Sequence, residues 1–171
     1  RGSSVMPEDE AISSDRLKAL LKKVDPEVLQ QVMPLTRGVV TMIFTDIVNS
    51  SKIKAEIGDR PYFNGVLKRH DDLVRECVSH HNGRGLKTIG DAFLVGFAVP
   101  VDAVASAVEI QERLTTPPIR AGHGFLQVRI GLHTGIPIVY RDDVSELIDL
   151  SGTDVDKAAR VEGLARGDQV L

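Results

Sequence analysis

The spacing of apolar residues changes along the chain, and each change predicts a new element. GVVTMIFTD, residues 38–46, is apolar on both faces and predicts a buried central strand. Residues 125–135 and 136–140 predict two strands that form a hairpin, and 169–171 predict the start of a strand that this sequence leaves incomplete. Apolar residues three and four apart predict four helices, namely one capped by Ser50 and others over 61–81, 101–114 and 151–165.

The stretch LKTIGDAFLVGF, residues 86–97, predicts a β-hairpin with Gly at the first central turn position, as a type II′ turn requires. In the predicted register Lys87 faces Leu94, and Leu86 faces Val95. The face that carries Lys87 is otherwise apolar, so we expect a helix or a second subunit to cover it and to supply a partner for the lysine. A lysine that guards an edge strand against aggregation is the alternative.

The order of elements predicts an α+β sandwich of the ferredoxin-like type, with an antiparallel-containing sheet and helices packed on one face. We divide the chain into an N-terminal extension, 1–37, and a body, 38–171. Within the extension, residues 15–33 have helical spacing and predict two short helices that meet at Pro26. They serve either as a connector in a dimer-forming stalk or as surface helices packed on their own domain.

The composition, 42% hydrophobic and 26% charged, is ordinary for a globular protein. A net charge of −3 gives no reason to expect nucleic acid or an anionic membrane surface as partner. The single cysteine, Cys77, is expected to be a small apolar residue on a helix, and it fits a reducing compartment. No apolar run approaches the length of a membrane span. We therefore expect a cytoplasmic protein, or the cytosolic part of a larger one.

Two carboxylates are predicted to meet at one edge of the sheet. Asp46 ends the first strand, and Asp91 lies in the hairpin turn. Carboxylates aimed at one point repel each other unless a cation or a proton joins them. Oxygen ligands next to a helix that begins near Ser50, with its free N–H groups, suit Mg²⁺ and phosphate. Solvated loop carboxylates remain the alternative from these residues alone.

The last predicted helix carries a second polar group. Asp156 and Arg160 are four residues apart and share one helical face, and Asp149 precedes the helix. An acid four residues before a base is also an ordinary stabilising surface pair.

Four stretches in this order resemble the catalytic domain of class III adenylyl/guanylyl cyclases: FTDIVNSS, LKTIGDAFLVGF, VRIGLHTG and DLSGTDVDKAARVE. The resemblance runs from about Gly38 to the C-terminus and is closest to the bacterial homodimeric adenylyl cyclase type. It implies conversion of ATP to 3′,5′-cyclic AMP and pyrophosphate with two divalent ions, Mg²⁺ or Mn²⁺. It also implies a homodimer with two active sites at its interface, which would include the apolar face around Ile89 and Leu94.

The resemblance assigns roles to single residues. Asp46 and Asp91 match the acids that hold two metals, and Ile47 matches a residue that lends its backbone carbonyl. Lys87 and Asp149 match the pair that selects adenine. In this family one subunit provides the metal acids, and the other provides the purine pair.

Two arginines also match positions of the family, and one aspartate differs from the family's usual residue. Arg160 matches an arginine that stabilises charge on the α-phosphate, and Arg129 matches one that touches the triphosphate. The family usually has asparagine at the position of Asp156. The carboxylate of Asp156 only accepts hydrogen bonds and is expected to clamp Arg160. We expect a weak adenylyl cyclase. The alternative is a cyclase-like module that binds nucleotide and serves in regulation or dimerisation; a diguanylate-cyclase palm has less support, because no GGDEF-like turn occurs.

Overall fold

The computed structural model describes residues 38–142 and 148–171, with only the backbone at positions 85 and 86. The predicted helices of the N-terminal extension lie outside these residues. No helix in the described ranges has the length and apolar character needed to cross a membrane. The elements, in chain order, are β1 Val40–Ile47, α3 Ser50–Ile57, α4 Asp59–Pro61, the π-helix η2 Tyr62–Leu67, α5 Lys68–His80, β2 Arg84–Ile89, β3 Ala92–Phe97, α6 Pro100–Thr115, β4 Arg120–Ala121, β5 Gly124–Phe125, β6 Val128–Gly135, β7 Ile138–Arg141, β8 Ile148–Ser151 and α7 Thr153–Leu164.

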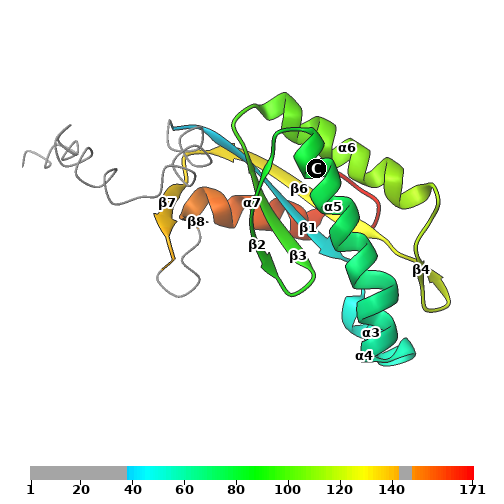
Figure 1. The fold of residues 1–171 in the computed structure, drawn as a ribbon. Coiled ribbons are helices and arrows are strands. Elements are labelled where there is room, and N and C mark those ends of the chain that lie inside the picture. Colours follow the sequence, from blue (N-terminus) through cyan, green and yellow to red (C-terminus); the bar gives the residue numbers. More distant parts are fainter. Residues whose placement is uncertain (1–37, 143–147) are drawn as a thin grey trace, which may run out of the picture.

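A four-stranded antiparallel sheet in the order β2-β3-β1-β6 forms the centre of the fold (Figure 1). β1 lies between β3 and β6, and all its residues except Asp46 are buried. The apolar character of both faces of this segment demands such a central position. The predicted buried strand and the α+β fold class are therefore confirmed.

Helices cover both faces of the sheet. Ile43 and Val95 belong to the core beneath α5 and α6, whereas Met42 and Leu94 pack with Ala158 of α7 on the opposite face. The prediction that the helices lie on one face holds for α5 and α6 and is wrong for α7, because alternate residues of β1 are apolar on both sides and both sides need cover. Leu94 is fully buried by its own chain, so the expected cover of this face is a helix, the first of the two alternatives, and the implied dimer interface cannot include Leu94.

The β2–β3 hairpin is confirmed, and its turn glycine has the positive φ, 67°, that a type II′ turn needs. Lys87 pairs with Leu94 as predicted. The predicted pairing of Leu86 with Val95 is wrong, since Gly85 takes that place and the register shifts between Gly85 and Lys87. Such a bulge places two residues opposite one and bends the strand.

The hairpin predicted over 125–140 does not form. β6 extends along β1, while β7 pairs with β8, which places Tyr140 opposite Asp149. Pro137 separates β6 from β7 and has no N–H to continue the ladder. The strand start predicted at 169–171 is present as a parallel bridge between Val170 and Ile130 of β6.

Two helix predictions need correction at their ends. Ser50 is the first residue of α3 rather than its cap, and the N-cap position belongs to Asn49, which has a left-handed φ of 57°. The long helix predicted over 61–81 is present as a succession of α4, η2 and α5, so a π-helical segment interrupts it. Such π-helical segments are uncommon and often lie near functional sites.

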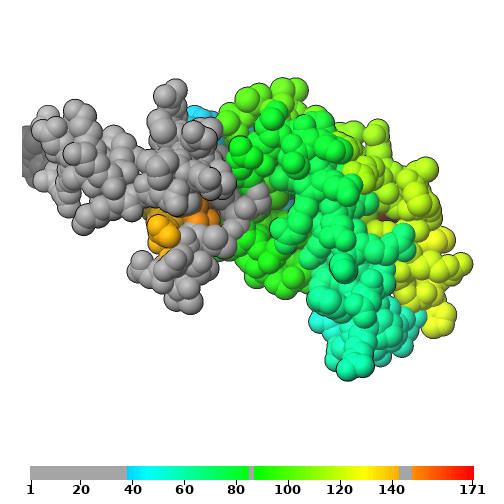
Figure 2. All heavy atoms as spheres, viewed as in Figure 1, coloured from blue at the N-terminus to red at the C-terminus, as the bar shows by residue number. Residues whose placement is uncertain are grey.

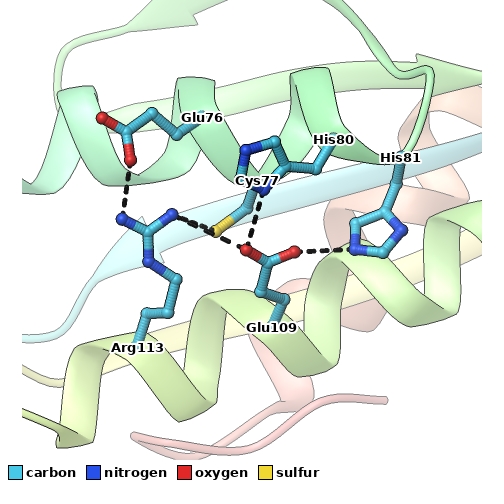
Figure 3. A network of polar contacts seen from close by, with 6 residues as sticks. All are labelled: Glu76, Cys77, His80, His81, Glu109 and Arg113. Atoms are coloured by element: carbon cyan, nitrogen blue, oxygen red, sulfur yellow. Dashed lines mark hydrogen bonds and ion pairs between the residues drawn. The ribbon is translucent and has the colours of Figure 1, made fainter.

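Polar side chains join α5 to α6 (Figure 3). Ring nitrogens of His80 and His81 lie 3.1 and 2.7 Å from the two carboxylate oxygens of Glu109. Because an ionised carboxylate only accepts hydrogen bonds, each histidine donates a ring N–H to it. The hydrogen bond from His80 is the main cause of a lowered pKa of Glu109. Beside them Cys77 is buried, and burial raises the pKa of its thiol to about 11. As predicted, the cysteine is a small buried residue of a helix.

α7 approaches β6 closely because β6 carries glycine where the helix crosses it. A Cβ atom at Gly131 would lie 2.1 Å from the backbone nitrogen of Glu162, and one at Gly135 would lie 2.4 Å from Cγ of Asp154. Ala158, midway between Asp154 and Glu162, is fully buried. Residues four apart share a helical face, so these three form the side of α7 that faces the sheet.

We predict that Gly131→Ala lowers the free energy of unfolding by about 1–3 kcal/mol, because the new methyl group meets a helix backbone that must move as a whole. The matched control is Gly163→Ala in α7, where no atom lies within 4 Å of the added Cβ. That substitution is expected to stabilise the protein by about 0.5–1 kcal/mol, since alanine favours helix. Urea unfolding midpoints measure both effects, and equal midpoints would contradict the close approach.

Candidate active site

Two acidic side chains lie at the same edge of the sheet. Asp46 follows Thr45, which pairs with Phe93, and Asp91 lies in the turn two residues before Phe93. Oδ2 of Asp91 is buried and has no hydrogen-bond partner. The structure thus brings Asp46 and Asp91 together as predicted, and it leaves one carboxylate oxygen without a donor.

Arg129 of β6 lies directly opposite Asp46 in the sheet register. Its Nη2 donates to Oδ2 of Asp46 at 2.6 Å, and its Nε lies 2.5 Å from Oε1 of Glu162 on α7. The hydrogen bond to Asp46 is the main cause of a raised pKa of the Arg129 guanidinium. Burial raises the pKa of Glu162, and the charge of Arg129 opposes that rise. Sequence reasoning missed Glu162, although its spacing from Ala158 places it on the inner side of the helix.

Tyr62 of the π-helix η2 is a second residue that the sequence analysis missed. Its side chain is 2% exposed. Burial and then the charge of Asp91 raise the pKa of Tyr62 to about 12. The hydroxyl therefore keeps its proton at neutral pH and lies near the carboxylates. Ser50 is near this edge as well, at the start of α3.

The residues at this edge fit a hard divalent cation. An anionic oxygen buried without a donor, such as Oδ2 of Asp91, is costly unless a positive charge faces it. Asp46 and Asp91 supply oxygen ligands, and Ile47 is the buried last residue of β1 beside them. In the described ranges no group of three or more His, Cys, Asp or Glu side chains could hold a metal ion. An ion held here would therefore keep positions for water or phosphate, as Mg²⁺ usually does.

Lys87 and Asp149 form an ion pair, with Nζ 2.6 Å from Oδ2. Asp149 is 7% exposed, and its carboxylate also accepts from the hydroxyl of Tyr140 at 3.1 Å and from the backbone N–H of Leu150 at 2.7 Å. Lys87 therefore has the partner that the sequence analysis sought and is more than a guard of an edge strand. Tyr140 was missed, because its contact depends on the β7–β8 pairing. The bond to Asp149 is the main cause of a raised pKa of Tyr140.

The two groups of side chains are separate. In the described part of the chain, no hydrogen bond or ion pair joins Lys87 or Asp149 to Asp46 or Asp91. Lys87 lies on the strand face that carries Leu94 and α7, whereas Asp91 lies at the tip of the hairpin. The described part of the chain thus carries two separate polar clusters.

Asp156 and Arg160 are exposed on the outer side of α7. Nε of Arg160 donates to the backbone carbonyl of Asp156 at 3.2 Å, and the two side chains form no ion pair. The predicted clamp is therefore wrong in this structure. Helical side chains lean toward the N-terminus, so the short Asp156 side chain leans away from Arg160, while Arg160 leans back over the carbonyl.

A family model described as "Adenylate and Guanylate cyclase catalytic domain" matches residues 33–171. An adenylate cyclase of Lachancea kluyveri is 32% identical over 169 residues, which cover 88% of this chain and 9% of that protein. A receptor-type adenylate cyclase of Trypanosoma brucei brucei is 30% identical over 170 residues, which cover 78% of this chain and 14% of that protein. A solved adenylate cyclase structure from Trypanosoma brucei, in its monomeric state, has a TM-score of 0.63 at 26% identity and covers 79% of this chain and 73% of that one.

The chain belongs to the adenylate and guanylate cyclase catalytic domain family. It spans only a small part of the curated relatives it matches. These relatives come from a fungus and a trypanosome, so the similarity does not single out the bacterial type that the motifs suggested.

We predict that Arg129→Met lowers the free energy of unfolding by about 2 kcal/mol near neutral pH, because Asp46 and the half-buried Glu162 lose their shared cation. The pKa of Glu162 in the folded state is already raised, so its ionisation costs stability as the pH rises. Without Arg129 that pKa rises further, and the deficit of the variant grows from pH 5 to pH 7.5. Urea midpoints at both pH values measure this. Arg166→Met, at an exposed arginine, is the control, and a deficit independent of pH would contradict the expectation.

Proposed function

We propose that the domain is an adenylyl cyclase that converts ATP to 3′,5′-cyclic AMP and pyrophosphate. The observation that carries the proposal is the pair of Lys87 and Asp149, a cation and a buried carboxylate whose atoms lie 2.6 Å apart. The adenylate cyclases among the relatives support the same choice. A cytoplasmic location, where ATP and reduced thiols coexist, fits this role and the unpaired Cys77.

Adenine is the purine that this pair suits. An ammonium group only donates hydrogen bonds, and an ionised carboxylate only accepts them. Adenine offers an acceptor at ring N1 and a donor at its 6-amino group, so Lys87 and Asp149 match both. Guanine reverses the pattern at these two positions. The hydroxyl of Tyr140 and the N–H of Leu150 hold the carboxylate in place.

In this proposal the phosphates bind at the edge of the sheet that carries Asp46 and Asp91, which we call the acidic edge. Asp46, Asp91 and the carbonyl of Ile47 would hold two divalent ions, Mg²⁺ or Mn²⁺, which supply activation of the ribose 3′-hydroxyl and neutralisation of phosphate charge when bound. In this arrangement Arg129 contacts the triphosphate and no longer contacts Asp46. The first turn of α3, at Ser50, offers backbone N–H groups to phosphate oxygens.

The reaction exchanges a phosphoanhydride bond for a phosphate ester bond. The ribose 3′-oxygen forms a bond to the α-phosphorus, and the bond from that phosphorus to pyrophosphate breaks, with the two oxygens in line. Arg160 stabilises the charge that develops on the α-phosphate. Its exposure on α7 suits this role, because the guanidinium is free to leave the carbonyl of Asp156 for a phosphate oxygen.

A homodimer completes two equal sites. One subunit gives Asp46 and Asp91, and the other gives Lys87, Asp149 and Arg160. The separation of these groups within one chain supports the division, and Ile89 beside the hairpin turn is 53% exposed and available for contact. Two-fold symmetry then produces two equivalent sites, as in the bacterial homodimeric type.

A cyclase-like module that binds nucleotide without turnover is the second candidate. Two observations favour it: Asp156 stands where the family usually has asparagine, and Arg160 is bound to a backbone carbonyl. ATP binding without cyclic AMP formation would distinguish this candidate from the first.

We predict that the protein forms cyclic AMP from ATP with Mg²⁺ or Mn²⁺, and that activity rises faster than linearly with protein concentration as dimers form. Asp46→Ala is expected to abolish activity because the metal ions lose a ligand. Cyclic nucleotide assays at several protein concentrations, with GTP in a parallel series, measure rate and purine preference. Product from GTP at the ATP rate would contradict the adenine assignment, and bound ATP with no product would favour the second candidate.

We predict that Asp156→Asn raises kcat by roughly 10-fold or more, because an amide restores a hydrogen-bond donor and removes a negative charge near the triphosphate. Asp72→Asn, which removes an exposed carboxylate on α5, is the matched control and is expected to leave kcat unchanged. Steady-state rates at saturating ATP measure both variants. An unchanged or slower Asp156→Asn variant would show that the aspartate does not impair catalysis.

A further inference from the structure

The outer face of α6 carries a stripe of exposed valines. Val101, Val104 and Val108 are 67%, 51% and 44% exposed. Their spacing of three and four residues places them on one side of the helix. In Figure 2 the lime-green atoms of α6 lie at the molecular surface, along the upper right of the view. A helix that is apolar on its outer side as well as its inner side indicates a surface that something else covers.

The stripe continues onto the end of the sheet. Thr41 pairs with Phe97, and the residues two places beyond this pair are Val39 and Val99, which are 56% and 46% exposed. Val99 is also the N-cap of α6, so the strand end leads directly into the helix. We call the set of Val39, Val99, Val101, Val104 and Val108 the valine patch. Single exposed apolar residues are ordinary, whereas a continuous group of this kind marks an interaction surface.

We propose that the valine patch is the docking surface for residues 15–33 of the same chain. This segment has the amphipathic spacing of two short helices, and its apolar positions are Leu17, Leu20, Leu21, Val24, Val28, Leu29 and Val32. Short amphipathic helices are only marginally stable in water and need a surface against which to pack. Of the two alternatives stated for residues 15–33, the proposal favours surface helices packed on their own domain and not a connector in a dimer-forming stalk.

The chain connectivity supports this occupant. The segment enters the body at Val39, which is itself part of the patch, after a link of residues 34–38. Five extended residues span up to about 17 Å, and Val101 and Val108 are only about 10 Å apart along the helix axis. Gly38 has a φ of 118° and open space around a Cβ position, so the backbone can turn back there. A short tether also gives the segment an effective concentration in the millimolar range.

The charges of the two surfaces are complementary. α6 carries carboxylates beside the stripe, at Asp102 and Glu112. The first half of the segment is basic, with Arg16, Lys18, Lys22 and Lys23. Opposite charges at the rim of an apolar contact favour a specific orientation and add modest affinity.

Disulfide trapping in the full chain tests the proposal. The variant Leu21→Cys/Val104→Cys is oxidised, and the product is identified on a non-reducing gel and by peptide mapping. Cys77 does not compete, because it is buried and the pKa of its thiol is raised to about 11. The control is Leu21→Cys/Phe63→Cys, since Phe63 is 58% exposed and lies on η2 away from the patch. We expect an intramolecular cross-link in the first variant at a yield ~10-fold or more above the control.

Two results would overturn the proposal. Cross-linked dimers as the main product would show that a second copy covers the patch, and equal yields in test and control would show no docking. A second measurement uses trypsin, which cleaves after Lys22 and Lys23. Val104→Asp/Val108→Asp is expected to speed that cleavage ~10-fold or more, because the docked segment is released and exposed to protease. Cleavage at the wild-type rate would contradict docking, and neither measurement depends on catalytic activity.

Discussion

The contact of α7 with β6 fixes the geometry on which the rest of the site depends. Because Gly131 has no side chain, the helix backbone at Glu162 lies against the strand itself. Glu162 is thereby brought to Arg129, which the β1–β6 register already places opposite Asp46. The outward side of the same helix presents Asp156 and Arg160 to solvent. One approach of helix to strand thus places Glu162 beside the acidic edge and sets the orientation of α7.

At the acidic edge the carboxylates outnumber the cationic side chains that neutralise them. The charges of Asp46, Glu162 and Asp91 all raise the pKa of Arg129, the arginine that they share. Burial raises the pKa of Tyr62, so its hydroxyl remains neutral and supplies no charge. A fold selected for stability alone would avoid buried acids and an unpartnered carboxylate oxygen. Such an imbalance is expected where a bound cation completes the structure.

Local patterns predicted the parts of the fold that local forces decide. β1, the β2–β3 turn and α6 follow from apolar period and turn chemistry, which act over a few residues. The pairing of β7 with β8 and the position of α7 depend on contacts between distant segments, and no local pattern reports them. For the same reason Lys87, Asp149 and the two acids of the edge were found from motifs, while Tyr140 and Glu162 were not.

The two proposed interfaces use different surfaces of the domain, and this has a consequence for assembly. The valine patch lies on α6 and at the end of the sheet where Val39 enters, whereas the dimer needs the hairpin tip and the Lys87–Asp149 pair. α6 and α7 pack on opposite faces of the sheet, so a segment docked on α6 does not cover the residues around α7. Residues 15–33, docked as proposed, would therefore stabilise a single subunit without competing with its partner. In the proposed arrangement the surfaces that form the active sites also hold the two subunits together, so ATP bound at those sites would strengthen the dimer.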